Sequence, residues 1–555
     1  MTSTTPNAML AALQALKASR KALEPLTESI HNPAEIAPSI PKYFAANGAP
    51  LNEQQSEAVD LAISGRSFCL IGAAGSGKTT TLREVIQHIL KTFPEEPQAK
   101  SIALVSFTRR AVANIRKAVA DIGASQFCHT IHSFLEYCPE DIEYLTADGE
   151  AKTSRQFRPR RHEMNPILEC KLIIIDESSM VSYADLYRNL REACPNAIFI
   201  FVGDLNQLKP VFGDAVLGHK LNSIPVVELT HIYRQAMDSP IVGFQHKFTL
   251  AGRVPTTLEL EAYTTQGQLQ FHPIRRCGQD GESIAFRIFE NYLKPRLDSG
   301  EYDPELDVIL VPKNEGLGQV TFNLLIAQHL GQKRNAEIHE IRANGKAFYY
   351  APGDLVQANK IDCEILSIMP NKSYRGAWCK PSSTKMTRWG FVESNESDFD
   401  LFDDVLANFK VHVIAKPEED SDDKDSGGRA GSHIVTVRNL ETGDTLELKS
   451  NAQLLSLQLN YAMTIHRSQG SEWRRVHLIL HNSAAAMLSR ELLYTGMTRA
   501  KEQLSVLYSP DTNPGARNSS VAQAIKSQRI PGRTWQEKAK HFFDKLELME
   551  WTDGE

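Results

Sequence analysis

The stretch Ser67-Phe-Cys-Leu-Ile-Gly-Ala-Ala-Gly-Ser-Gly-Lys-Thr79 decides the fold class of this 555-residue chain. An apolar run ends in a glycine-rich loop, and helix-forming residues follow from Thr80 to Leu90. This order is typical of a P-loop, whose backbone N–H groups wrap the phosphates of a nucleotide at the N-terminus of a helix. We therefore predict that Lys78 contacts the β- and γ-phosphates and that Thr79 ligates Mg²⁺. The nucleotide-binding residues expected in this loop are Gly72, Gly75, Gly77, Lys78, Thr79 and Thr80.

A second apolar run, Leu172-Ile-Ile-Ile-Asp176-Glu177, ends in two carboxylates. A buried strand rarely carries charges at its tip unless they are used. Asp176 is expected to hold Mg²⁺, and Glu177 is expected to accept a proton from the attacking water. Together with the P-loop, the pair predicts hydrolysis of ATP.

Near-continuous apolar runs of this kind suit the strands of a parallel sheet that is covered on both faces. One set lies between about 50 and 235, and a second includes 308–312, 476–480 and 504–508. Two α/β cores are therefore expected. The stretch between 350 and 450 instead alternates apolar and polar residues around an acidic, glycine-rich segment at 417–431, which indicates a small β domain with a flexible loop.

These patterns predict how the chain is divided. The expected parts are a leader at 1–42, a first core at 43–135 and 170–235, an insertion at 136–169, a second core at 236–349 and 451–510, a β domain at 350–450 and a tail at 511–555.

Composition narrows the class of protein. No run of about 18 apolar residues could cross a bilayer, and the N-terminus lacks the pattern of a signal peptide. The eight cysteines form no CxxC pair and no cluster at zinc-ligand spacing, so we expect reduced thiols and a cytoplasmic protein. The formal net charge of −6 argues against a protein that coats nucleic acid with its whole surface, but it leaves room for a local basic groove. The Ala- and Leu-rich leader is expected to be a packed helix or, alternatively, a helix that binds a partner.

Five further segments carry polar residues in an ordered series. They are LNEQQSEAV at 51–59, VGDLNQLKPV at 202–211, ELTHIYRQ at 228–235, YAMTIHRSQGSE at 461–472 and LLYTGMTRA at 492–500. In these segments the chain resembles superfamily 1 helicases, and within them the RecD-like and Dda-like group. The resemblance extends from about 50 to 508, with gaps, and implies two RecA-like cores.

The resemblance also implies the rest of the ATP site. Gln207 would sense the γ-phosphate and couple it to the DNA groove, while Arg234 and Arg499 would supply positive charge. Phosphoryl transfer spreads negative charge over the γ-phosphate oxygens, so a catalytic ATPase needs such cations beyond the P-loop lysine. If Arg499 comes from the second core, ATP would hold the two cores together and hydrolysis would release them. The residues that would complete the nucleotide site are Gln55, which would read adenine, Tyr233, Gly470 and Glu472.

A motor must grip a sugar–phosphate backbone without reading bases, through hydroxyls, amides and a few stacking rings. By resemblance, Phe107 could stack on a base and Thr108 could bind phosphate. For Pro312 and Asn314, ordinary loop chemistry is an equal alternative. The full set of expected nucleic-acid contacts is Phe107, Thr108, Arg109, Thr130 and His132 in the first core, Phe157 in the insertion, and Pro312, Asn314, Thr464 and His466 in the second core.

The insertion contains Asp148-Gly149 between two extended segments, which predicts a hairpin. In Dda-like enzymes a hairpin at this place is the pin that splits the duplex. Phe157, flanked by Arg155 and Arg158, could therefore stack on the first unpaired base. The alternative is a solvated basic loop with an exposed ring.

The resemblance implies an ATP- and Mg²⁺-dependent DNA helicase with an inserted hairpin and an inserted SH3-like β domain. Motif similarity favours 5′ to 3′ movement, although Phe107-Thr108 resembles the opposite subgroup. The implied partners are single-stranded DNA, junctions of single- and double-stranded DNA, and proteins of replication, repair or recombination. A monomer in the cytoplasm is expected, at a nucleoid or in the host cytoplasm of a virus. Two alternatives stay open: an RNA track, and an ATP-gated nucleic-acid-binding scaffold without processive unwinding.

Overall fold

The computed structural model describes residues 43–542, with gaps at 46–47, 93–100, 146–150, 211–212, 233–237, 266, 275–279, 344–345, 359–360, 372–429, 441 and 511–518. The predicted leader at 1–42 lies outside the described residues. The chain divides into two units, residues 1–56 and 57–555. In the first unit, Phe44 pairs with Pro50 in an isolated bridge, and Asn52 precedes helix α2 (Glu53–Ile63).

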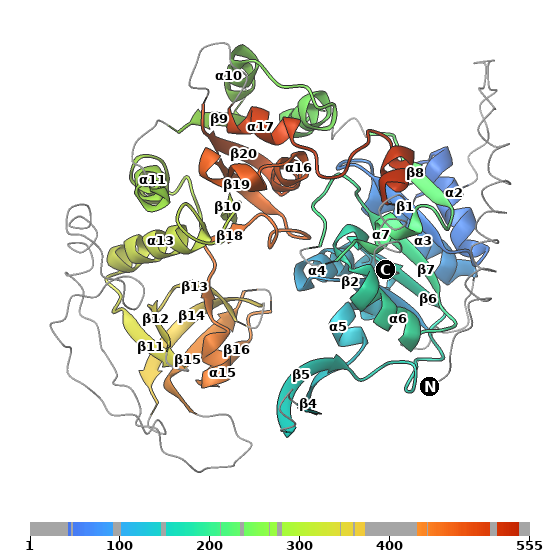
Figure 1. Cartoon of the computed structure of the whole chain (residues 1–555), viewed down its shortest axis with the longest axis horizontal. Helices are drawn as coiled ribbons and strands as arrows, with labels where there is room; N and C mark the ends of the chain where they lie inside the picture. The colour runs from blue at the N-terminus through green and yellow to red at the C-terminus, as the bar shows by residue number, and fades with distance from the viewer. Residues whose placement is uncertain are drawn as a thin grey trace. The chain divides into compact units, whose positions relative to one another are not determined.

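A six-stranded parallel sheet, in the order β3-β2-β6-β7-β1-β8, forms the first core (Figure 1). Strands β2 and β6 are buried along their whole length, as near-continuous apolar runs predict. The strands are β1 (Phe68–Gly72), β2 (Ile102–Ser106), β3 (Cys128–Thr130), β6 (Leu172–Ile175), β7 (Ile198–Gly203) and β8 (Val226–Leu229). The helices are α3 (Lys78–Thr92), α4 (Arg109–Ala118), α5 (Ile131–Phe134), α6 (Arg188–Ala193) and α7 (Val216–Lys220).

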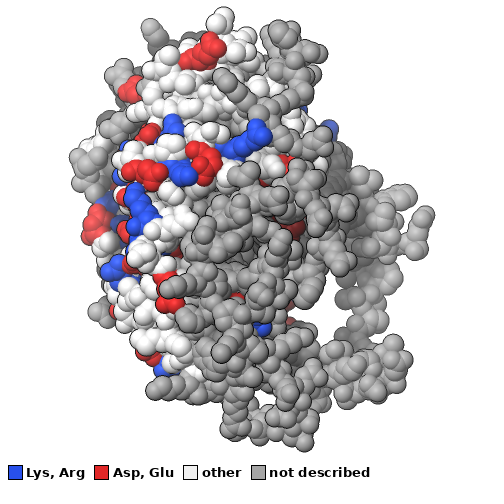
Figure 2. Space-filling view, turned by 90° about the vertical axis from the view of Figure 1, so that its left-hand side faces the viewer, with Lys and Arg blue, Asp and Glu red and all other residues white. Residues whose placement is uncertain are grey.

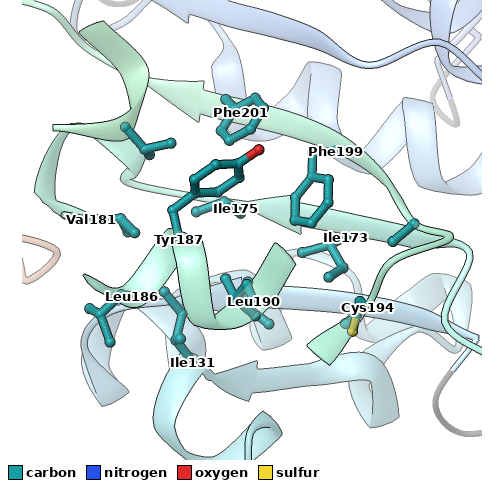
Figure 3. Packing of buried hydrophobic residues seen from close by; sticks show 14 of the residues in the cluster. Ile131, Ile173, Ile175, Val181, Leu186, Tyr187, Leu190, Cys194, Phe199 and Phe201 are labelled. Carbon is teal, nitrogen blue, oxygen red and sulfur yellow. The ribbon is translucent and has the colours of Figure 1, made fainter. Parts of the chain in front are cut away.

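One face of this sheet is covered by the segment that follows β6. Figure 3 shows the Tyr187 ring over the sheet, close to Phe199 and Phe201. The ring centroids of Tyr187 and these two residues lie 5.5 and 5.6 Å apart. Leu190 and Ile173 belong to the same buried cluster. Because close-packed aromatic and aliphatic side chains fix the strands, the strand ends that carry polar residues are held in place.

The second core is a five-stranded parallel sheet in the order β18-β10-β19-β20-β9. Val308 and Leu310 of β10 join one buried cluster, whereas Ile309 and Val311 join another, so the sheet is covered on both faces. The prediction of two α/β cores is confirmed. The strands are β9 (Leu269–Pro273), β10 (Asp307–Val311), β18 (Ala462–Thr464), β19 (Trp473–Leu480) and β20 (Ala500–Tyr508). The helices are α9 (Pro240–Phe244), α10 (Thr257–Thr265), α11 (Gly281–Ile288), α12 (Lys294–Ser299), α13 (Gln319–Arg334), α16 (Arg490–Met497) and α17 (Ser520–Lys526).

Two sets of antiparallel strands lie outside these sheets. Within the expected insertion at 136–169, β4 (Tyr137–Leu145) pairs with β5 (Ala151–Pro159), and the Asp148-Gly149 turn falls outside the described residues. A small β unit follows α13, and its elements begin at His339, before the boundary at 350 expected from the sequence. Its strands and helix are β11 (His339–Ala343), β12 (Lys346–Tyr350), β13 (Leu355–Ala358), β14 (Ile361–Pro370), β15 (Ala430–Asn439), β16 (Thr445–Ser450), β17 (Gln458–Leu459) and α15 (Asn451–Leu455).

Charged side chains are mixed over the face of the molecule shown in Figure 2, where acidic and basic groups lie interspersed. Among the described residues visible in this view, the interspersed charges produce no large field of one sign. Over the part of the chain that the structure describes, no helix is both long and apolar enough to cross a bilayer.

Candidate nucleotide site and nucleic-acid track

The P-loop joins β1 to α3 and depends on its glycines. Gly75 and Gly77 have φ angles of 80° and 82°, which side chains rarely tolerate. A Cβ on Gly72 would lie 2.3 Å from Ser76 Oγ. Lys78 Nζ donates to the carbonyl oxygens of Gly72 and Ala73, at 2.7 and 3.0 Å. Ser76 Oγ is buried without a hydrogen-bond partner among the described residues, so the loop retains an unused polar group as well as a cation, and both suit phosphate.

The two predicted carboxylates follow β6. Glu177 has a left-handed backbone, with φ 50° and ψ 41°, a costly conformation for a residue with a Cβ and one that concentrates at functional sites. Burial, and secondly the neighbouring Glu177, raise the pKa of Asp176 to about 7, while Lys78 acts in the opposite direction. A site with this excess of negative charge fits a divalent cation, which Asp176 and the exposed Thr79 would hold.

A buried tyrosine connects the P-loop to the second core. Tyr494, on α16, donates from its hydroxyl to Asp204 Oδ2 at 2.6 Å and accepts from the Ala74 N–H at 2.7 Å. Burial raises the pKa of Tyr494 well above its usual range, so the hydroxyl keeps its proton. Asp204 and Tyr494 both lie in segments that the sequence singled out, but the sequence assigned neither a role. Tyr494 is about 290 positions from Asp204 and about 420 positions from Ala74, so the sequence gives no sign that they meet.

Leu208, which follows the 204–207 loop of the first core, also contacts the second core. Its N–H donates to Thr495 Oγ1 at 3.0 Å, and its carbonyl oxygen accepts from Gln469 Nε2 at 2.8 Å. The adjacent Gln207 is buried, and its Oε1 has no hydrogen-bond partner within the described ranges. The predicted γ-phosphate sensor therefore carries an unused acceptor beside a loop that is fixed by two segments of the second core.

Arg499 follows α16 and is 4% exposed. Its guanidinium donates to the Thr495 and Ser471 carbonyl oxygens, both at 3.1 Å, and to Thr498 Oγ1 at 2.9 Å. These acceptors are neutral oxygens, so the guanidinium is oriented by its own core, and no carboxylate of the described residues forms an ion pair with it.

Three other predicted nucleotide contacts have structural roles of their own. Gln55 forms a capping box with Asn52: its Oε1 accepts from the Asn52 N–H at 3.1 Å, and its N–H donates to Asn52 Oδ1 at 2.8 Å. Gly470 has φ 72°, and a Cβ there would lie 2.7 Å from Thr108 Oγ1. The exposed Glu472 pairs with Lys501 at 3.3 Å. Tyr233 and Arg234 lie outside the described residues.

Predicted track residues share strand ends in each core. In the first, Ser106 of β2 pairs in register with Thr130 of β3, so Phe107 and Thr108 follow one strand beside Thr130 at the end of the next. Thr108 and Thr130 cap α4 and α5 through their hydroxyl groups. Aromatic rings pack beside these strand ends. The ring centroid of His132 lies 6.0 Å from the ring centroid of Phe107 and 4.9 Å from that of Tyr137.

In the second core, Val311 of β10 pairs with Thr464 of β18, which places Pro312 beside Thr464. Thr464 is buried and its Oγ1 accepts from the Arg467 N–H at 3.3 Å, whereas Asn314 is exposed. Burial, and secondly Arg529, lower the pKa of His466. Parallel strands therefore bring the predicted residues of each core to one sheet edge, although Thr464 already has an intramolecular partner.

Arg110, next to the exposed Arg109, is a neighbour of the track to which the sequence assigned no role. Its Nε donates to Asp362 Oδ2 of the small β unit at 2.6 Å, and its guanidinium lies 4.8 Å from the centroid of the Trp473 ring. The side chain of Phe157 lies outside the described residues. Its backbone pairs with Pro139, two positions from the Tyr137–Pro159 pair at the base of the hairpin.

Comparisons with known proteins agree with this arrangement. The AAA domain family matches residues 55–213, and the UvrD-like helicase C-terminal domain family matches residues 459–507. The chain is 26% identical over 455 residues to the ATP-dependent RecD2 DNA helicase of Deinococcus radiodurans, covering 82% of this chain and 48% of that protein. It is 24% identical over 529 residues to the RecBCD enzyme subunit RecD of Haemophilus influenzae, covering 90% of this chain and 74% of the relative.

Among solved structures, Pif1 helicase from Bacteroides in complex with ADP-AlF3 and ssDNA is 16% identical, with a TM-score of 0.44, over 91% of this chain and 98% of that one. The chain spans about half the length of the RecD2 relative and about three quarters of the RecD subunit. The ordered family matches on the two cores, together with the RecD relatives, make the chain similar to the RecD-like group of superfamily 1 helicases.

Proposed function

We propose that this chain is an ATP-dependent DNA helicase that hydrolyses ATP with Mg²⁺, moves 5′ to 3′ along single-stranded DNA and unwinds duplex DNA. The observation that carries the proposal is the pair of hydrogen bonds from Ala74 to Tyr494 and from Tyr494 to Asp204. They connect the P-loop of one core to a helix of the other, so a change at the nucleotide is transmitted between the cores. The RecD2 relative is named as an ATP-dependent DNA helicase, which supports DNA as the track.

Each group of the site has a task in this reaction. Bound Mg²⁺ would neutralise charge that develops on the phosphates. Lys78 would exchange its two carbonyl acceptors for phosphate oxygens, while Asp176 and Thr79 would hold the metal. Glu177 would orient the attacking water and accept its proton, and Arg499 would donate to the γ-phosphate.

The experiment that tests the function is ATP hydrolysis by the full chain without nucleic acid, with single-stranded DNA and with single-stranded RNA of the same sequence. We expect DNA to stimulate turnover most. Stronger stimulation by RNA would indicate that the chain moves along RNA and not DNA. Hydrolysis that neither polymer stimulates would favour an ATP-gated scaffold over a motor.

Direction is tested on duplexes that carry one single-stranded tail. Since most motifs resemble the RecD-like side, we expect strand separation on the 5′-tailed duplex and little on the 3′-tailed duplex. Both substrates must be compared at the same ionic strength, because phosphate contacts make binding steeply salt-dependent. Separation of only the 3′-tailed duplex would reverse the assignment and make Phe107-Thr108 the better guide to polarity.

Phe157 is proposed to separate the strands. In the hairpin register, Phe157 pairs with Pro139, two positions from Tyr137 near the base of the hairpin. The ring of Tyr137 contacts His132 of the track. Phe157→Ala should therefore reduce unwinding about tenfold or more, because base–aromatic stacking is worth roughly 1–3 kcal/mol, while DNA-stimulated hydrolysis stays within about twofold.

The matched control is Tyr144→Ala, near the far end of the same hairpin, where Tyr144 pairs with Lys152. This control should leave unwinding nearly unchanged. Equal losses of unwinding and hydrolysis in Phe157→Ala, or no loss of either, would remove Phe157 from the splitting step.

A further inference from the structure

The chain returns to the first core after it has completed the second. Helix α17 contributes Val521 and Ile525 to the buried cluster of the second core. The helical segment 535–542, drawn in dark red in Figure 1, instead contributes Ala539 to the cluster of the first core. Asn222 Nδ2 donates to the Ala539 carbonyl oxygen at 2.9 Å. Residues 519–542 are thus an integral part of both cores, within a region that the sequence predicted only as a tail.

The segment between these two helices, 527–534, is fixed by the start of α16. Glu491 accepts from the N–H groups of Arg529 and Ile530, at 3.0 and 3.1 Å. Arg490 donates to Gln528 Oε1 at 2.9 Å and to the Ile525 carbonyl oxygen at 2.9 and 3.0 Å. These bonds direct the chain back toward the first core at a defined place.

Lys538 lies on this C-terminal helix, and its side chain contacts the 204–207 loop of the predicted ATP site. It is 5% exposed, and its Nζ donates to the Leu205 carbonyl oxygen at 3.1 Å and to Asn206 Oδ1 at 2.7 Å. Asn206 in turn donates to Asp204 Oδ1 through its backbone N–H and its Nδ2, at 2.9 and 3.1 Å. Asp204 accepts from Tyr494, and Tyr494 accepts from Ala74. A continuous series of hydrogen bonds therefore extends from the C-terminal helix to the P-loop.

Burying an ammonium group is costly, and burial lowers the pKa of Lys538, although Asp204 and Glu491 oppose this. Packing alone would be served better by an apolar residue, so the hydrogen bonds must account for a lysine here. A cavity of about 270 Å³ adjoins these groups and is lined by Gly72, Asp204 and Lys538, among others. Asp204, Leu205 and Asn206 border this space, and hydrogen bonds from Lys538 and Tyr494 hold the loop beside it.

We propose that Lys538 is a positioning residue of the ATPase: from the C-terminal helix it fixes the 204–207 loop and, through Asp204 and Tyr494, the backbone of the P-loop. Lys538 touches neither substrate nor metal in this role. The inference rests on the proposed function, because ATP hydrolysis is what the positioned groups carry out.

The test compares three variants of the full chain. Lys538→Met keeps most of the side-chain volume and removes the charge, Lys538→Arg keeps the charge, and Lys540→Met is the control on the exposed side of the same helix. In DNA-stimulated hydrolysis, Lys538→Met should lower kcat ~10- to 100-fold while the KM for ATP stays within about twofold, since misplacing reacting groups by about 1 Å costs on that order. Lys538→Arg should recover most of kcat, and Lys540→Met should match the wild type.

The pH profile separates positioning from general stability. Since burial lowers the pKa of Lys538, its charge is lost at a lower pH than the charge of an exposed lysine. The wild-type kcat should therefore fall as the pH rises, and Lys538→Arg should extend the active range to higher pH, because a guanidinium stays protonated.

A second variant covers the case in which Lys538→Met does not fold. Asn206→Ala removes the link between Lys538 and Asp204, and it should lower kcat to a similar extent; where both single variants fold, the double variant should lose little more. Unchanged kcat in folded Lys538→Met, or in Asn206→Ala, would overturn the inference. A wild-type protein without any ATP hydrolysis would instead overturn the proposed function, and this inference with it.

Discussion

Glu177→Gln is expected to bind ATP nearly as tightly as the wild type and to lose ~10²- to 10⁴-fold in turnover, the usual contribution of a positioned base. Glutamine has almost the same shape as glutamate and retains the Cβ, so the left-handed backbone at this residue need not change. What it lacks is the ability to accept the proton of the attacking water. Nucleotide titration and steady-state hydrolysis measure the two effects separately.

Two companions make this result interpretable. Lys78→Ala should lose turnover for a different reason, because it removes the cation that contacts the phosphates, and its affinity for ATP should fall as well. Glu169→Gln changes an exposed carboxylate at the end of the insertion, just before β6, and should leave both properties unchanged. Near-normal turnover in Glu177→Gln would remove Glu177 from the reaction.

Arg499→Ala is expected to have an effect of similar or larger size. The residue comes from the second core, and its guanidinium is oriented by neutral oxygens, so its charge is available to the γ-phosphate. Arginines that stabilise phosphoryl transfer contribute ~10³- to 10⁵-fold in kcat, which is about 4–7 kcal/mol. Single-turnover hydrolysis at saturating ATP and DNA measures this loss without a contribution from product release.

Arg499→Lys should recover only part of the activity, because an ammonium group cannot reproduce the planar set of donors. Arg188→Ala is the matched control, since Arg188 is 67% exposed on the first core. If Arg499→Ala keeps normal single-turnover rates but no longer unwinds DNA, the residue transmits the reaction between the cores and does not take part in it.

Much of the fold could be predicted because it follows from local patterns. A short, continuous apolar run such as Leu172–Ile175 is typical of a strand that is buried on both faces of a sheet. The glycines of the P-loop likewise reveal their backbone geometry directly, as Gly75 and Gly77 show.

The interactions that connect the cores could not be predicted in this way. Asp204 and Tyr494 were both inside recognised segments, but periodicity gives no information about which residues meet across a distance of 290 positions. Arg110 and Asp362 are 252 positions apart and belong to different parts of the fold. Gln55 illustrates another limit: its predicted role at adenine gave no indication that its side chain also caps the helix in which it lies.

The return of the chain to the first core also limits how far the two cores can separate. The cores are joined covalently twice, once between β8 and α9 and again through residues 527–534. A single connection would allow large relative motion of the cores, whereas two connections restrict it. Eight residues span at most roughly 29 Å when fully extended, and those at 527–534 are already partly anchored to α16. While the C-terminal helix stays on the first core, any separation of the two cores must be taken up by this short connection, so its length sets an upper limit on that separation.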